Sequence, residues 1–330
     1  MPEPWSRQPL PIPDAEVEFL IGTAARAPSL QNTQPWRFRV LSNSIELYAD
    51  LSRKLRVDRQ CREMPISCGG ALFGLRLALR SLGLDPVVEL FPEPVREWLL
   101  ARVQLHAGDP MTAAEQALLQ ALLHRHTHRG PFEPEPLPDG LIGNLEAEAA
   151  EEGATLALVD RVRAVERLAD IVASATLASG RDEAAGAEMR EWTRASGSGA
   201  RDGVPATAFA TESDPHRGRL RQRDFDLGRG LGLLSVGGPP PAATAVLLTP
   251  GDTRGDWMCA GQALHRVLTR AAASWVFGSL YTEPLEEAQT RWLVADRLVL
   301  AGAPQMILQL GLARSARAAA RRPPAELVDP

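Results

Sequence analysis

A dense group of polar side chains lies between Ala27 and Trp36, where five of the six residues from 29 to 34 can form hydrogen bonds. A proline precedes this group, and Pro35 and Trp36 close it. Closely spaced donors and acceptors of this kind suit a planar ring that carries several acceptor atoms. A polar helix cap followed by a turn has a similar composition. Composition alone therefore leaves both interpretations open.

A second segment, residues 125–129, places two arginines four positions apart with Thr127 between them. Forked guanidinium donors and a hydroxyl are the groups that bind a phosphate. A solvated basic helix end would also fit, and so would a metal-binding tract formed by His124, His126 and His128. Alternating histidines converge on a metal only from a strand, and the sequence holds no further cluster of metal ligands. We therefore predict no metal site.

The bulk composition is that of an ordinary globular protein. Of the 330 residues, 45% are hydrophobic and 23% are charged, and the net charge of -5 gives no reason to expect a nucleic acid as partner. Lys54 is the only lysine among 36 basic residues, which we attribute to a composition bias of the genome. The cysteines Cys61, Cys68 and Cys259 are too few and too scattered for a disulfide framework or a four-ligand zinc site.

The chain shows no signal for a membrane or for secretion. Its N-terminus lacks a basic start followed by an apolar stretch, and no apolar run approaches the roughly 18 residues of a membrane span. We expect a cytoplasmic protein that acts on a small molecule, with neither nucleic acid nor membrane as a partner.

Helix and strand periodicities alternate along the chain and predict an α+β fold. In the first third we expect a helix over 14–26, a hairpin over 36–49, a helix over 67–82 and strands over 87–91 and 98–105. The other predicted elements are helices over 111–123, 141–152, 161–178, 184–194, 255–277 and 285–298, and strands over 155–159, 243–249 and 305–310. Residues 195–241 are rich in Gly, Arg, Asp and Pro and interrupt the alternation.

The first polar segment resembles the PS-x-x-N-x-Q-P-W motif of the nitroreductase superfamily of FMN enzymes. The resemblance implies that Ser29 and Asn32 contact the isoalloxazine ring. It also assigns Pro28 and Gln34 to the same cofactor site. In this family the motif serves the active site of the partner subunit in an obligate dimer.

The second segment is similar to the R-x-S-x-K/R-x-F element with which nitroreductases begin. The similarity implies that Arg125 and Thr127 contact the phosphate or ribityl chain of FMN and that Arg129 lies near flavin N1. A cation there would stabilise the anionic reduced flavin. Arg129 is the one candidate for a catalytic role, and no other catalytic residue is assigned.

Three later stretches resemble the family more weakly. Residues 275–279 resemble a helix-end loop where backbone amides approach the flavin, which implies roles for Gly278 and Ser279; an ordinary glycine helix stop fits equally well. Residues 304–311 resemble the final core strand. The closing basic element places Arg322 at the phosphate, with a disordered basic tail as the alternative.

The two main segments occur in the reverse of the usual order, because the Arg element normally precedes the polar segment. This order implies an internal fusion, in which residues 1–123 supply the polar segment and residues 124–330 supply the Arg element to one complete site. The second flavin site expected from such a fusion would be degenerate. The layout as a whole is similar to the Acg family of fused nitroreductase-like proteins. That similarity implies two pseudo-symmetric halves, each with a mainly antiparallel sheet flanked by helices, and a lid insertion at about 181–241.

The resemblance implies an FMN-dependent NAD(P)H oxidoreductase that reduces nitro-aromatic or quinone-like acceptors by hydride transfer through flavin N5. No Rossmann fingerprint is needed, since the nicotinamide would stack transiently on the flavin; the glycines at 228–232 lack the third fingerprint glycine. One alternative is an FMN-binding or FMN-sequestering protein with an inactive, lidded site, and another is a paralogue without flavin. A monomeric pseudo-dimer and a homodimer both remain open.

Overall fold

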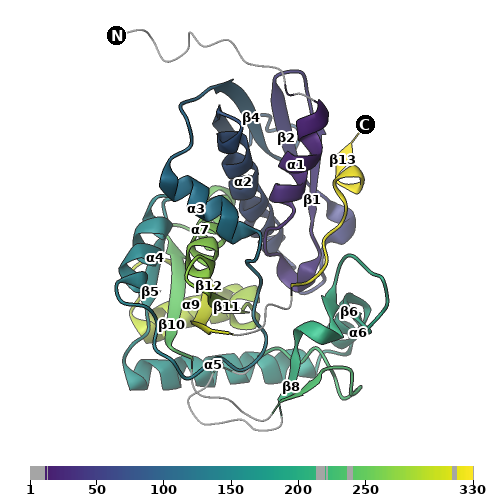
Figure 1. The fold of residues 1–330 in the computed structure, drawn as a ribbon. Helices are drawn as coiled ribbons and strands as arrows, with labels where there is room; N and C mark the ends of the chain where they lie inside the picture. Colours follow the sequence, from purple (N-terminus) through teal and green to yellow (C-terminus); the bar gives the residue numbers. More distant parts are fainter. Residues whose placement is uncertain are drawn as a thin grey trace.

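The computed structural model describes residues 12, 14–212, 220, 222–235, 241–313 and 318–329. Within these residues the chain forms two main sheets with helices packed between and around them (Figure 1). The first sheet has the strand order β13-β1-β2-β4-β3 and the second has the order β11-β12-β10-β5. Two short two-stranded pairs, β6 with β7 and β8 with β9, lie outside these sheets.

The first sheet and its helices come mainly from the first third of the chain. Their bounds are α1 (Asp14–Ala24), η1 (Leu30–Asn32), β1 (Trp36–Val40), β2 (Ser44–Ala49), η2 (Leu51–Arg53), α2 (Glu63–Ser81), β3 (Leu84–Leu90), β4 (Leu99–Ala107) and α3 (Ala113–Leu122). Trp36, Phe38 and Leu72 are fully buried in this core. The helix, the hairpin, the second helix and the two strands predicted for this part of the chain are all present.

The second sheet and the insertion follow. Their bounds are α4 (Leu141–Ala150), β5 (Thr155–Leu158), α5 (Val162–Gly180), α6 (Glu183–Trp192), β6 (Thr193–Arg194), β7 (Val204–Pro205), η3 (Ala206–Ala208), β8 (Ala210–Glu212), β9 (Leu233–Ser235), β10 (Ala243–Thr249), α7 (Arg254–Ala272), β11 (Val276–Tyr281), α8 (Glu283–Glu286), α9 (Ala288–Leu298), β12 (Ala303–Leu312), η4 (Pro324–Glu326) and β13 (Val328–Asp329). In Figure 1, α6, β6 and β8 form a group beside the two sheets.

The two sheets have the same topology. In chain order, β1, β2, β3 and β4 of the first sheet correspond to β5, β10, β11 and β12 of the second, and both sets are arranged first-second-fourth-third. All pairings among these strands are antiparallel, and the pairing of the second strand with the fourth shifts register near its end in both, at Leu47/Tyr48 and at Leu247/Leu248. The fold is therefore the predicted α+β arrangement of two pseudo-symmetric halves.

The central helices α2 and α7 cross at a matched pair of glycines. A Cβ atom on Gly69 would lie 2.3 Å from the carbonyl oxygen of Met258, and one on Gly261 would lie 1.9 Å from the carbonyl oxygen of Ile66. Each glycine thus meets the residue three positions before the other glycine, as a local twofold axis requires. Only glycine lets the two backbones approach this closely.

Helix α2 begins at Glu63, four residues before the predicted start. The Asp58 carboxylate accepts hydrogen bonds from the backbone amides of Arg62, Glu63 and Met64 at 2.7 to 3.2 Å, so it satisfies the donors that a helix N-terminus leaves free. Pro65 falls in the first turn, where a missing amide hydrogen has little cost.

The prediction of one helix over 255–277 is wrong, and so is that of a helix-end loop over 275–279. Helix α7 ends at Ala272, Trp275 turns the chain with a φ of 56°, and Val276 begins strand β11. Gly278 therefore lies within a strand. A Cβ on Gly278 would approach Leu268 Cδ2 to 2.6 Å, so close packing of the sheet on α7 explains this glycine.

The end of the chain returns to the first sheet. Strand β13 pairs in parallel with β1, with Phe38 opposite Val328, and Leu327 is fully buried in the first core. Figure 1 shows this segment running alongside β1. The division of the chain at residue 124 stays a prediction, but residues 324–329 pack on the first half.

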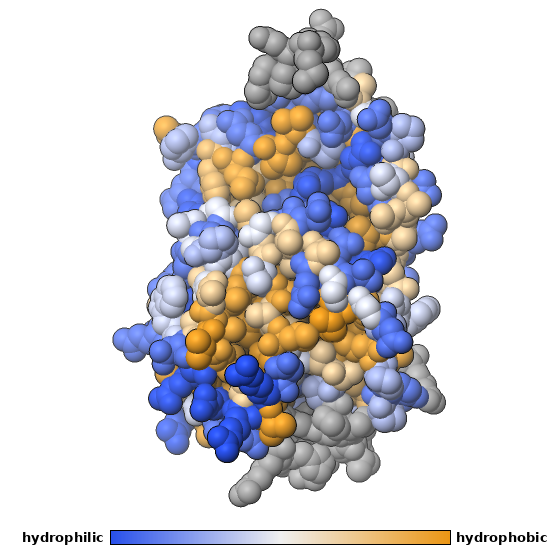
Figure 2. All heavy atoms as spheres, turned by 90° about the vertical axis from the view of Figure 1, so that its left-hand side faces the viewer, coloured by the Kyte–Doolittle hydropathy of each residue, from blue (hydrophilic) through white to orange (hydrophobic). Residues whose placement is uncertain are grey.

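The surface mixes apolar and polar side chains. On the side that carries α3 and α4, apolar side chains gather in a band across the lower half, bordered by charged ones (Figure 2). No helix among the described residues has both the length and the apolar character to cross a membrane.

Candidate functional site

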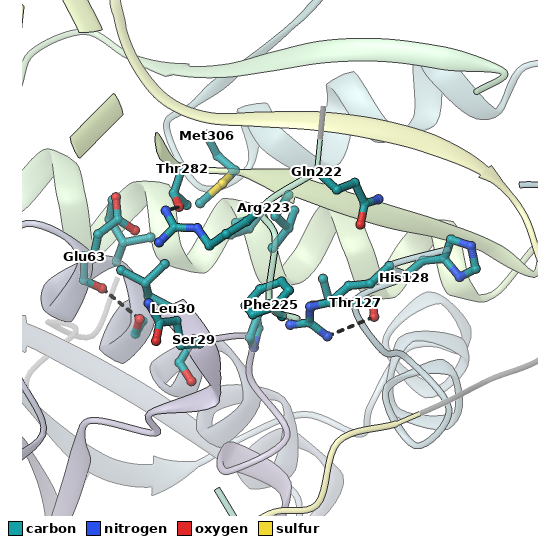
Figure 3. Close-up of a pocket in the computed structure, with 17 residues that line it drawn as sticks. Ser29, Leu30, Glu63, Thr127, His128, Gln222, Arg223, Phe225, Thr282 and Met306 are labelled. Atoms are coloured by element: carbon teal, nitrogen blue, oxygen red, sulfur yellow. Dashed lines mark hydrogen bonds between the residues drawn. The ribbon is translucent and has the colours of Figure 1, made fainter. Parts of the chain in front are cut away.

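A pocket lies where the two halves meet. Its walls come from the polar segment, the start of α2, the Arg element, the insertion between α5 and β10, helix α7 and the second sheet (Figure 3). The lining residues are Pro28, Ser29, Leu30, Gln31, Glu63, Ile66, Ser67, Thr127, His128, Arg129, Gln222, Arg223, Phe225, Leu264, Leu280, Thr282 and Met306. The two segments that the sequence singled out therefore share one pocket.

The polar segment has a strained backbone. Gln31, Asn32 and Gln34 have φ values of 50°, 57° and 51°, in the left-handed region that non-glycine residues rarely adopt. The Ser29 hydroxyl accepts a hydrogen bond of 3.0 Å from the backbone amide of Gln34 and so holds the turn closed. Strain of this kind persists only where the surrounding structure enforces it, and it is concentrated at functional sites.

Asn32 and Gln34 do not line the pocket and instead connect three distant segments. The Asn32 side-chain amide donates to the carbonyl oxygens of Gly203 and Ala320 at 2.9 and 3.1 Å. The Gln34 amide donates to the carbonyl oxygen of Arg201 at 2.8 Å, and its oxygen accepts from the backbone amide of Arg322. Both side chains thus hold the insertion between α5 and β10 and the C-terminal segment against the polar segment.

The Arg element lies beside the edge strand β11. Thr127 forms a parallel bridge with Gly278, whose carbonyl oxygen accepts from the backbone amide of His128 at 2.9 Å. The Ser279 hydroxyl donates to the carbonyl oxygen of His128 at 3.0 Å. Gly278 and Ser279 are absent from the pocket lining, so their observed role is to position Thr127 and Arg129, which do line it.

Two arginines of this element, Arg125 and Arg129, lie close to Arg26 and Arg321. Arg125 is 4% exposed, and its Nη2 donates to the carbonyl oxygen of Arg26 at 2.8 Å, while its Nε and Nη1 have no hydrogen-bond partner among the described residues. Burial, reinforced by the charges of Arg321, Arg129 and Arg26, lowers the pKa of Arg125 to about 9. Burial also lowers the pKa of Arg129 to about 10. Buried cations without a counter-ion are costly, so the cluster is suited to an anion.

Arg321, and not Arg322, joins this cluster. Its guanidinium donates to the carbonyl oxygens of Ala25 and Ala27 at 2.9 and 3.2 Å and to Asn32 Oδ1 at 3.0 Å. The Arg322 side chain points elsewhere and contacts Glu326, donating to its carbonyl oxygen at 2.9 Å. Neighbouring residues of an extended segment face opposite sides. The phosphate contact of Arg322 stays a prediction, since its Nη1 is buried without a hydrogen-bond partner among the described residues.

Relatives of the chain decide the family. It is 38% identical to a Mycobacterium tuberculosis (strain H37Rv) protein named "Putative NAD(P)H nitroreductase Rv3131". The alignment spans 309 residues and covers 92% of this chain and 87% of that protein. The chain belongs to the nitroreductase family. It is also 27% identical over 306 residues to the "Putative NAD(P)H nitroreductase acg" of the same organism, with 90% and 89% of the two chains covered. The predicted relation to Acg is thereby confirmed.

The chain also resembles a solved structure. A solved structure described as a putative nitroreductase from Anabaena variabilis aligns with 91% of this chain and 73% of its own, at 12% identity and a TM-score of 0.44. No family model matches the chain.

In this nitroreductase-like chain the two halves differ at the place that faces the pocket. Gly69 and Gly261 correspond, so the next residues, Gly70 and Gln262, correspond as well. Gly70 lies against the polar segment, where a Cβ atom would make ordinary contacts with Ala27 Cβ and Pro28 Cδ at 3.4 and 3.6 Å. The corresponding Gln262 carries a long polar side chain, which accepts from Arg76 Nη1 at 2.8 Å.

The second half also lacks a counterpart of the polar segment. Residues 25–35 separate α1 from β1, but only residues 151–154 separate α4 from β5. Within this short link Glu152 forms an ion pair of 2.7 Å with Arg76. Both differences favour one pocket in each chain.

The three alternating histidines have different neighbours. His124 stacks on Trp275, with ring centroids 5.0 Å apart, and its Nε2 contacts the carbonyl oxygen of Ala272. His126 packs against Phe277, and burial lowers its pKa to about 4. No group of three or more potential metal ligands occurs in the described part of the chain. His124 and His126 act here as packing residues, whereas His128 lines the pocket.

Glu63 is a pocket residue that the sequence did not single out. Its carboxylate pairs with Arg62 and is 5% exposed, and burial raises its pKa to about 7. The signal that could have identified it is an acidic residue in the first turn of an otherwise apolar helix.

Glu63→Gln should change the pH dependence of stability. Between about pH 4.5 and 7 the folded state keeps a proton that the unfolded state has lost, so Glu63 lowers stability as the pH rises through this window. The free energy of unfolding of the variant, relative to that of the wild type, should rise by up to about 3 kcal/mol from pH 4.5 to pH 8. Urea unfolding at the two pH values measures this; a constant or falling difference would contradict it.

Proposed function

We propose that the chain binds one FMN in the pocket between its halves and uses it as an NAD(P)H-dependent oxidoreductase acting on nitro-aromatic or quinone-like acceptors. The observation that carries the proposal is the cluster of buried arginines beside the pocket, with two donor atoms of Arg125 left without partners among the described residues. The relatives, which are named as putative NAD(P)H nitroreductases, support the electron donor and the class of reaction.

The described residues fit FMN. The cationic donors of Arg125 and Arg321 would hold its phosphate, and the Thr127 hydroxyl would contact the ribityl chain. The guanidinium of Arg129, which lies 5.5 Å from the ring centroid of Phe225, would supply positive charge near the ring. Pro28 and Ser29 line the opposite wall and would contact the ring face or edge. When bound, FMN would accept and donate hydride at N5.

The chain's own groups would bind, orient and exclude water. Phe225, Leu264, Leu280 and Met306 give the pocket apolar walls. Such walls strengthen hydrogen bonds and charges inside the site because the local dielectric is low. The positive charge of Arg129 would favour the reduced, anionic form of the cofactor. No proton-transfer residue is required by these contacts.

Purification of the full chain tests this proposal. The protein should be yellow or become so with added FMN, and anaerobic NADPH or NADH should bleach the flavin absorbance promptly. A protein that binds no FMN would refute the proposal. A protein that binds FMN but responds to dithionite and to neither nicotinamide would refute the reductase activity alone.

The lid contacts favour a second candidate, an FMN-sequestering protein. Arg53 pairs with Asp202 and lies 5.3 Å from the ring centroid of Trp192, and Asn32 contacts the backbone of Gly203. These bonds hold residues 192–203 against the first half. A lid fixed in this way would limit access of a nicotinamide to the pocket, and the dithionite comparison separates the two candidates.

We further propose residues 1–123 and 124–330 as the two halves, with residues 181–241 as the lid insertion. The expectation of one FMN in each chain rests on Gln262 and on the short link 151–154 in the second half. Cytoplasmic localisation stays a prediction from the sequence.

A further inference from the structure

Glu63 lies in the wall between two cavities. It lines the pocket between the halves, where it is the one carboxylate among the lining residues that the structure describes. It also lines a second, smaller cavity together with Asp58. Figure 3 shows the Glu63 carboxylate beside Arg223, at the end of the pocket away from Thr127. One acidic group thus borders both the place of a bound molecule and a separate polar cavity.

The Glu63 side chain is held in place and keeps one oxygen available. Its backbone amide donates to the Asp58 carboxylate at 3.1 Å, which fixes the residue at the start of α2. Within the described residues its carboxylate accepts one hydrogen bond, from Arg62 Nη1 to Oε1. Arg62 itself lies outside the pocket lining and donates to the carbonyl oxygen of Gln305 at 2.7 Å. The Oε2 atom therefore remains available to a ligand.

The surroundings of Glu63 favour its protonated, neutral form. Burial is the largest effect. The positive charge of Arg62 opposes it, as does that of Arg223 in the insertion, whereas the negative charges of Asp58 and of Glu286 on α8 reinforce it. The balance raises the pKa of Glu63 to about 7. A carboxylic acid with a pKa near neutrality can both hold a proton and release it to a reacting group.

We propose that Glu63 is a catalytic acid that gives its proton to an oxygen atom of the bound acceptor. The inference rests on the proposed function, from which it takes the cofactor, the electron donor and the class of acceptor. The contacts to FMN require no proton-transfer residue, but the acceptor does require one.

The proton completes the balance of the reaction. A quinone that receives a hydride, which originates from NAD(P)H, becomes a monoanion, and one proton converts the monoanion to the neutral hydroquinone. The O–H bond of Glu63 breaks, an O–H bond forms on the acceptor, and the Glu63 carboxylate then regains a proton from solvent. No oxidant or reductant beyond the two substrates is needed.

The test is the anaerobic reoxidation of FMN-loaded protein, reduced with one equivalent of dithionite and followed by stopped-flow absorbance. With tetramethyl-1,4-benzoquinone the rate constant of the wild type should fall about tenfold per pH unit above about pH 7, as the acid loses its proton. Glu63→Gln should lower the rate constant at least about 100-fold at about pH 6 and remove this pH dependence. Ferricyanide takes up electrons without a proton, so its rate constant should change less than about twofold in the same variant.

Glu283→Gln is the matched control. Glu283 is also a buried carboxylate, 7% exposed and 3.6 Å from Arg223 Nε, but it lies outside the pocket lining. Its variant should keep the quinone rate constant within about twofold of the wild-type value. A second readout needs no turnover: in the infrared difference spectrum between about pH 5.5 and pH 8.5, the wild type should show a protonated-carboxyl C=O band that Glu63→Gln lacks.

The outcomes separate the role of Glu63 from the proposed function. An equal loss of rate with the quinone and with ferricyanide, an unchanged quinone rate in Glu63→Gln, a wild-type rate that does not depend on pH, or the absence of the infrared band would overturn the role of Glu63 while the proposed function stands. A wild type that binds no FMN, or whose reduced flavin neither acceptor reoxidises, would instead refute the proposed function and this inference with it.

Discussion

Replacing Arg125 by methionine is expected to lower the affinity for FMN about 100-fold or more, while the affinity for riboflavin changes little. Methionine keeps most of the buried volume and removes the charge. Two donor atoms of Arg125 have no partner in the described structure, and hydrogen bonds from a charged donor contribute roughly 1.5 to 3 kcal/mol each. Riboflavin lacks the phosphate, so the ratio of the two affinities isolates the contact. Fluorescence titration of both flavins measures it.

One further variant serves as a control for Arg125, and a second tests the contact that holds Arg321. His126→Ala should leave FMN affinity unchanged, because His126 packs on Phe277 outside the pocket lining. Asn32→Ala should weaken FMN binding about tenfold, since its side-chain oxygen holds Arg321 through one hydrogen bond to a charged donor. If the Arg125 variant weakened FMN and riboflavin equally, the arginine cluster would not be the phosphate site.

Replacing Gly261 by alanine is expected to cost at least about 3 kcal/mol of stability, or to prevent folding. The added methyl would lie 1.9 Å from the carbonyl oxygen of Ile66, and the obstacle is backbone in the central helix pair, which cannot move aside. Relief would require separating α2 from α7, which together form the interface between the halves. Denaturant unfolding of the variant measures the loss.

Gly143→Ala is the matched control for this substitution. Gly143 also lies inside a helix, α4, but an added Cβ there would meet no atom within 4 Å. Alanine is the better helix former, so this variant should be about 1 kcal/mol more stable than the wild type. Equal effects of the two substitutions would mean that helix propensity, and not the close crossing, governs both sites.

The sequence was informative where the relevant residues are neighbours in the chain. Ser29 and Arg129 were identified because each lies in a short motif, and both line the pocket. The alternation of helices and strands also predicted the α+β class and the two halves. The helix predicted to continue to residue 277 was wrong because Val276 and Phe277 are apolar residues that continue the pattern of α7 while belonging to a strand.

Other parts of the site depend on which distant segments meet. Arg321 and Arg322 are adjacent and chemically identical, and only the path of the C-terminal segment decides which one faces Arg125. Arg223 lies in an irregular insertion with no periodicity to orient its side chain. Asn32 has the expected type and position, yet its hydrogen bonds go to the lid and the C-terminal segment. Motifs therefore located the pocket, and tertiary packing determined the roles.

The most direct test of the account is the stoichiometry of FMN binding to the full chain, measured by titration at protein concentrations far above the dissociation constant. A single site built from both halves, with Gln262 and Arg76 in contact at the symmetry-related place, predicts saturation at one FMN per chain. Saturation at two FMN per chain would show that the mate pocket is functional. The absence of binding would show that the arginine cluster serves another anion.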